Sequence, residues 1–74
     1  MIDIGTLIKE EIEKQDRTIS WLARKLNRNR AAVYRLLRKN SIDTQTLSEI
    51  SRLLRRDFFI ELSKGVFDDS IDEK

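Results

Sequence analysis

Apolar residues recur every three or four positions early in the chain, as on one face of an α-helix. This spacing predicts a first helix over residues 4–15, capped by Asp3, with an apolar stripe of Ile4, Leu7, Ile8 and Ile12. A second helix is predicted over residues 19–26, capped by Thr18, with an apolar arc of Ile19, Leu22, Ala23 and Leu26. Asn27 follows directly. Because asparagine tolerates the left-handed conformation, a sharp turn is expected there.

The third predicted helix, over about residues 30–39 with Asn29 as its cap, has two contrasting sides. With successive residues placed at about 100° intervals, the core side consists of Val33, Leu36 and Leu37. The opposite side consists of Ala31, Tyr34, Arg35 and Arg38. We therefore expect a helix that is anchored on one side and presents arginine, tyrosine and a small residue on the other.

The remainder of the chain predicts two more helices and a tail. A fourth helix over about residues 44–55, capped by Asp43, buries Leu47, Ile50 and Leu54. A short fifth helix, capped by Asp57 and ending near Gly65, carries the apolar cluster Phe58, Phe59, Ile60 and Leu62. Residues 66–74 are interpreted as an acidic, flexible tail. The prediction is one all-α domain over residues 1–65, a compact bundle of about five short helices.

The composition narrows the function classes. The chain has 74 residues without cysteine or histidine, which excludes disulfides, zinc fingers and thiol or imidazole catalysis. The acids at positions 10–13 are expected on an exposed helical side, and no glycine-rich phosphate loop is present. We therefore expect no enzyme activity, cofactor or metal. No signal peptide or membrane span is indicated, so a cytoplasmic location is expected, with association to the nucleoid when DNA is bound.

The basic residues are concentrated in the middle of the chain. Residues 17–40 contain eight basic residues and no acidic one. Residues 1–16 contain two basic and five acidic residues, and residues 41–74 contain five basic and eight acidic ones. The net charge of +2 conceals this segregation. A block of one sign indicates a polyanionic partner, and the simpler alternative is a solvated helical face.

The pattern of the second and third predicted helices resembles a known DNA-binding unit. Its apolar positions are Leu22, Ala23, Leu26, Val33 and Leu36. Over Ile19 to Arg38 the sequence resembles the helix-turn-helix of the lambda-repressor-like (Cro/cI, Xre) family, and with the flanking helices the similarity covers roughly residues 2–62. The resemblance implies a prokaryotic or phage transcription regulator whose third helix lies in the major groove.

The chain departs from the family pattern at several positions. Asn27 stands where the family usually has glycine in the turn, and Ile19 stands where a phosphate-binding glutamine is frequent. The third helix ends in Leu37-Arg38-Lys39, where the family often has Glu-x-Gly. These differences concern the phosphate contacts and the loop, and they leave the apolar frame unchanged.

The resemblance places six residues toward DNA: Asn29, Arg30, Ala31, Tyr34, Arg35 and Arg38. Arg30 and Arg35 suit guanine O6 and N7, Ala31 suits a thymine methyl, and Tyr34 suits a base or a phosphate. Residues expected at the DNA backbone are Ser20, Arg28, Arg38 and Lys39, and Asn29 is expected to cap the helix, to contact a phosphate, or both. The alternatives are solvated arginines and a tyrosine ring lying over neighbouring aliphatic chains. Trp21 is expected to pack partly against the first or fourth helix.

The apolar cluster of the fifth helix predicts a homodimer. Phe58, Phe59, Ile60 and Leu62 cannot all point one way on a helix, so some are expected to stay exposed unless a partner covers them. A two-fold dimer would read a pseudo-palindromic site with half-sites about 34 Å apart, or a multiple of that spacing. Two alternatives stay open: an antitoxin that binds a toxin as well as DNA, and a protein-interaction module without DNA binding.

Overall fold

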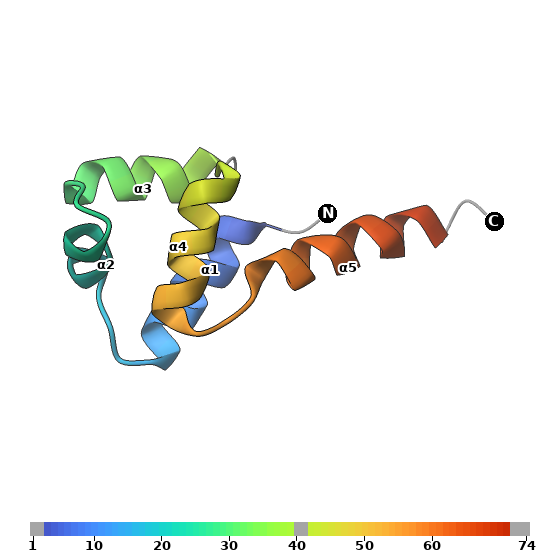
Figure 1. Cartoon of the computed structure of the whole chain (residues 1–74), viewed down its shortest axis with the longest axis horizontal. Helices are drawn as coiled ribbons and strands as arrows, with labels where there is room; N and C mark the ends of the chain where they lie inside the picture. The colour runs from blue at the N-terminus through green and yellow to red at the C-terminus, as the bar shows by residue number, and fades with distance from the viewer. Residues whose placement is uncertain (1–2, 40–41, 72–74) are drawn as a thin grey trace.

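The computed structural model describes residues 3–39 and 42–71, with side chains up to residue 66. These residues form helices and no strand, which confirms the all-α prediction (Figure 1). The helices are α1 (Ile4–Lys14), α2 (Ile19–Lys25), α3 (Arg30–Lys39), α4 (Thr44–Leu54) and α5 (Phe58–Ile71). Within these ranges every helix is too short or too polar to traverse a lipid bilayer.

Each helix begins where a short polar side chain was predicted to cap it. At α1 to α4 a side-chain oxygen accepts a hydrogen bond, at 2.7–3.2 Å, from the backbone N–H three residues further on. The caps are Asp3, Thr18, Asn29 and Asp43. At α5 the Asp57 carboxylate accepts from the N–H of Phe59 at 3.0 Å. Such caps satisfy N–H groups that a helix leaves unpaired, and each contributes about 1 kcal/mol.

Three helices end at a residue other than glycine in the left-handed conformation. These residues are Asp16 after α1, Asn27 after α2 and Arg55 after α4, with φ of 58°, 59° and 56°. In each case the next N–H bonds back across the last turn, as Arg17 does to Ile12 at 2.9 Å. The turn at Asn27 was predicted, and the conformation of Arg55 was not.

The core lies where the apolar stripes of the five helices meet. Its buried members are Ile4, Ile8, Ile12, Leu22, Ala23, Val33, Leu37, Leu47, Ile50, Leu54 and Phe58. The helices α1 and α3 cross closely at Gly5, where a Cβ would overlap the carbonyl oxygen of Leu37. This packing fixes α3 to the bundle through its apolar side.

Helix α5 differs from its prediction. It continues through Gly65 to Ile71, so the expected end at Gly65 is wrong and residues 66–71 are helical. Glycine serves as a helix terminator when it adopts a positive φ, and Gly65 does not. Residues 72–74 of the predicted tail lie outside the described residues. Figure 1 shows that the far turns of α5 extend beyond the other four helices.

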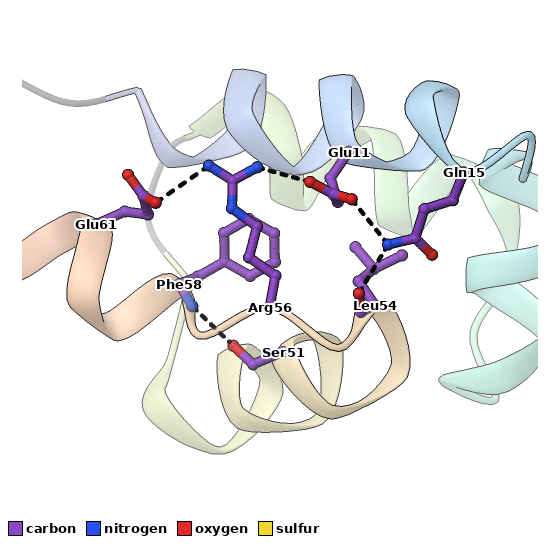
Figure 2. A network of polar contacts seen from close by, with 7 residues as sticks. All are labelled: Glu11, Gln15, Ser51, Leu54, Arg56, Phe58 and Glu61. Carbon is purple, nitrogen blue, oxygen red and sulfur yellow. Dashed lines mark hydrogen bonds and ion pairs between the residues drawn. The ribbon is translucent and has the colours of Figure 1, made fainter.

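A polar network fixes the start of α5 against α1 and the end of α4 (Figure 2). The Arg56 guanidinium donates to Glu11 Oε1 at 2.8 Å and to Glu61 Oε2 at 3.1 Å. The Gln15 amide donates to Glu11 Oε2 at 2.8 Å and to the Leu54 carbonyl at 2.7 Å. One arginine thus ties α1 to α5 where α5 leaves the bundle.

Glu11 is buried, which corrects the expectation that all the acids at positions 10–13 are exposed. It lies three residues after Ile8, so it shares the edge of the apolar stripe of α1. Hydrogen bonds from Gln15 and Arg56 lower the pKa of the Glu11 carboxyl below its ordinary value, and they outweigh desolvation, which raises it. The charged form of Glu11 is therefore the one that the fold stabilises.

Candidate nucleic-acid interface

The turn between α2 and α3 is held by backbone hydrogen bonds and by two asparagines. The N–H of Asn27 donates to the Arg24 carbonyl at 3.2 Å, and the N–H of Arg28 donates to the Ala23 carbonyl at 2.9 Å. Asn29 then caps α3, with its side-chain oxygen 2.7 Å from the N–H of Ala32. This turn needs a left-handed residue, and Asn27 fills the position without glycine.

Helix α3 is anchored on one side and exposed on the other, as the sequence predicts. Val33 and Leu37 are buried, and Leu36 packs partly against the core. The outward side chains are exposed, and these are Ala31, Tyr34, Arg35, Arg38 and Lys39. Figure 1 shows α3 along the upper edge of the bundle. The helix therefore presents a continuous polar side that a second molecule can reach.

Hydroxyl groups hold two of the predicted arginines. Arg30 Nη1 lies 3.3 Å from Ser20 Oγ, which links the starts of α3 and α2. Arg28 Nη2 lies 3.3 Å from Thr46 Oγ1 in the first turn of α4. Sequence reasoning did not identify Thr46, although its place three residues after the cap Asp43 could have drawn attention to it.

The basic residues between Arg17 and Lys39 form no ion pair within 4.0 Å among the described residues. Ion pairs among the described residues all involve Arg56, which bonds Glu11 and Glu61. Arg17 instead lies over the Trp21 ring, 4.4 Å from its centroid, and Trp21 is partly buried against the core as expected. A cationic surface without ion-paired carboxylates is suited to an external polyanion.

The four residues predicted for dimerisation divide into core and surface. Phe58 is fully buried, so its assignment to a dimer interface is wrong, and it belongs to the core instead. Leu62 packs partly against the core. Phe59 and Ile60 are 38% and 51% exposed, and Val66, which the sequence analysis did not single out, is 61% exposed. We call Phe59, Ile60 and Val66 the apolar α5 surface.

Comparison with protein-family models, curated proteins and solved structures finds no match to this chain. Within the described residues no three acidic side chains gather as a metal site. The exposed residues of α3 include three arginines, Arg30, Arg35 and Arg38, and one small residue, Ala31. Guanidinium groups bind phosphates and the edge of guanine through paired hydrogen bonds.

Proposed function

We propose that this chain is a sequence-specific, double-stranded DNA-binding transcription regulator with α3 in the major groove. The observation that carries the proposal is the exposed side of α3, where Ala31, Tyr34, Arg35 and Arg38 project from a helix anchored in the core. The major groove of B-DNA admits a helix of this kind. The resemblance of Ile19–Arg38 to the lambda-repressor-like helix-turn-helix supports the same function.

The proposal gives the exposed residues two kinds of role. Arg30, Arg35, Ala31 and Tyr34 contact base edges, with Ala31 allowing the helix backbone to approach closely. Residues assigned to the DNA backbone are Ser20, Arg28, Asn29, Arg38 and Lys39. Backbone contacts set the register and carry the salt dependence, whereas base contacts carry the sequence preference.

Selection of bound duplexes from a random library, at a stated salt concentration, tests this function. We expect enrichment of one motif with two related half-sites. The negative control is a variant with both Arg35→Ala and Arg38→Ala. Both residues are exposed, so the variant should keep the fold, and it should lose the enrichment. Failure of the wild-type protein to bind any duplex at low salt would contradict the proposal and favour a protein-interaction module.

The apolar α5 surface supports the further proposal of a homodimer that reads a pseudo-palindromic site. Phe59 and Val66 are seven residues apart and therefore share one helical stripe, which a second copy can cover. Sedimentation at micromolar concentration should show a dimer for the wild type and a monomer for Phe59→Asp. Gln45→Asp, at an exposed position of α4, should remain dimeric. A wild-type monomer would exclude the dimer.

The antitoxin alternative shares the DNA contacts and differs in what covers the apolar α5 surface. It predicts a stable complex with a toxin that co-purifies with the native protein and is released by Phe59→Asp. Co-purification of a second copy alone favours the plain regulator.

A further inference from the structure

The two flanks of α3 differ in charge. The flank at Tyr34 opens onto a groove of about 460 Å³ that α1 lines with Lys9, Glu10 and Glu13, so its charges are mixed. The opposite flank opens onto a groove of about 240 Å³ whose lining residues are Arg28, Ala32, Arg35, Leu36 and Lys39. Every charged residue that lines this second groove is basic. Arg17 also lines the first groove, so two basic and two acidic residues balance there. A chain of phosphates is therefore attracted more strongly to the second flank than to the first.

Arg28 is held at both ends on the basic flank. Its backbone N–H donates to the Ala23 carbonyl at 2.9 Å, within the turn before α3. Its guanidinium donates to Thr46 Oγ1, and Thr46 Oγ1 donates in turn to Asp43 Oδ2 at 3.1 Å. Thr46 is only 3% exposed, so this hydroxyl has a fixed position. The other N–H groups of the Arg28 guanidinium are available to donate to a ligand.

The Asp43 carboxylate completes this chain of hydrogen bonds. It accepts from the backbone N–H of Thr46 at 2.7 Å and from the Thr46 hydroxyl. These bonds, together with the nearby charge of Arg28, hold the pKa of Asp43 below its ordinary value. An ionised Asp43 orients the hydroxyl so that its lone pairs face Arg28.

We propose that one sugar-phosphate strand runs along the Arg28–Lys39 flank of α3 and that Thr46 positions Arg28 to bind a phosphate. The inference rests on the proposed DNA-binding function and adds α4 to the binding surface. Arg28 and Lys39 contact the strand, and Arg35 lies between them at the border with the base-reading side. Fixing a long side chain before binding removes an ordering cost that an unrestrained arginine incurs, which is worth about three- to tenfold in affinity.

Anisotropy titrations of a random-sequence duplex over a series of salt concentrations test the inference. Arg28→Gln and Lys39→Gln should each reduce the slope of log K against log salt by about one, as expected for one lost phosphate contact. Lys9→Gln, on the Tyr34 flank, is the matched control and should leave the slope unchanged. Equal slope changes for Lys9→Gln and Arg28→Gln would overturn the strand path.

Thr46 is tested in the same titrations. Thr46→Val keeps the Asp43 cap and removes the hydroxyl, so it should weaken binding about three- to tenfold. It should cause no further loss in an Arg28→Gln background, and Thr46→Ser should bind like the wild type. An equal loss with and without Arg28 would overturn the positioning role. A wild-type protein that binds no duplex would overturn the proposed function and this inference together, whereas duplex binding that is insensitive to Arg28→Gln would overturn the inference alone.

Discussion

At the scale of single residues, Gly5 sets the approach of α1 to α3. A Cβ there meets the backbone of Leu37, which cannot move aside like a flexible side chain. We expect Gly5→Ala to lower the free energy of unfolding by about 1–2 kcal/mol, because a clash with backbone belongs to the upper half of the ~1–3 kcal/mol range for overpacking and exceeds the gain of ~1 kcal/mol in helix propensity. Urea denaturation measures the change. Gly65→Ala, inside α5, should instead be neutral or stabilising, and the same loss at both sites would contradict this explanation.

Arg55 occupies a conformation that suits glycine. A left-handed φ costs an L-residue with a Cβ roughly 1–2 kcal/mol, and Arg55 is exposed with φ 56°. Arg55→Gly should therefore raise the free energy of unfolding by about 0.5–1 kcal/mol, after the entropy that glycine adds to the unfolded chain. Thermal denaturation checks the result. Arg52→Gly, three residues earlier within α4, should destabilise by about 1 kcal/mol.

Arg35 and Lys39 lie four residues apart on α3 and are assigned different contacts. Arg35→Ala should weaken binding to the selected duplex by about 1–3 kcal/mol and have a smaller effect on random duplex, because it removes the proposed base contact. Lys39→Ala should weaken both alike. Paired titrations against both duplexes measure the difference. Equal losses for the two variants, with an unchanged preferred sequence, would refute these roles.

The sequence predicted residues whose chemistry is local and missed those that depend on distant neighbours. Asn27 was recognisable because asparagine is frequent in the left-handed region. Arg55 has no such preference, and its left-handed φ is set where the chain closes α4, with the Arg56 N–H bonded back to the Ser51 carbonyl at 3.0 Å. Thr46 and Glu11 were missed because their partners, Arg28 and Arg56, are 18 and 45 residues away.

At the scale of elements, the anchoring of α5 depends on pH through Glu11. Its pKa is below the ordinary value of 4.5 in the fold, so the stabilisation is fully present above that value and is lost as pH falls through the lowered pKa. We expect Glu11→Gln to be less stable than the wild type at neutral pH and the difference to shrink below about pH 4.5. Urea denaturation between neutral pH and about pH 3 measures it. A difference in stability that stays constant over this pH range would contradict the role of Glu11.

The starts of the helices were predictable because capping chemistry lies in the sequence, and four of the five ends fell within one residue of their prediction. The fifth failed because Gly65 continues α5 instead of ending it. Phe58 was misassigned for a related reason. Four apolar residues within one five-residue stretch show that some must be buried, but only the packing of α5 on α1 and α4 selects which.

At the scale of the whole molecule, the segregation of charge could be predicted from the sequence, and the proposed path of a bound strand could not. The eight basic residues of the middle segment lie within residues 17–40, a stretch without an acidic residue. Glu10 and Glu13 of α1 line the groove at the Tyr34 flank of α3, whereas the charged residues that line the other groove are all basic. This asymmetry needs the three-dimensional arrangement, and it is the reason that the two flanks are assigned different roles.

The projecting turns of α5 have a consequence for the dilute protein (Figure 1). Isolated helices shorter than about 12–15 residues are marginal in water, and α5 has 14 residues. If a second copy covers the apolar α5 surface, the helix content of the protein depends on the protein concentration. The far-ultraviolet circular dichroism per residue should then weaken on dilution through the dissociation range of the dimer. Phe59→Asp should give the signal of the diluted wild type at every concentration. On this view, the last turns of α5 are fully helical only in the dimer.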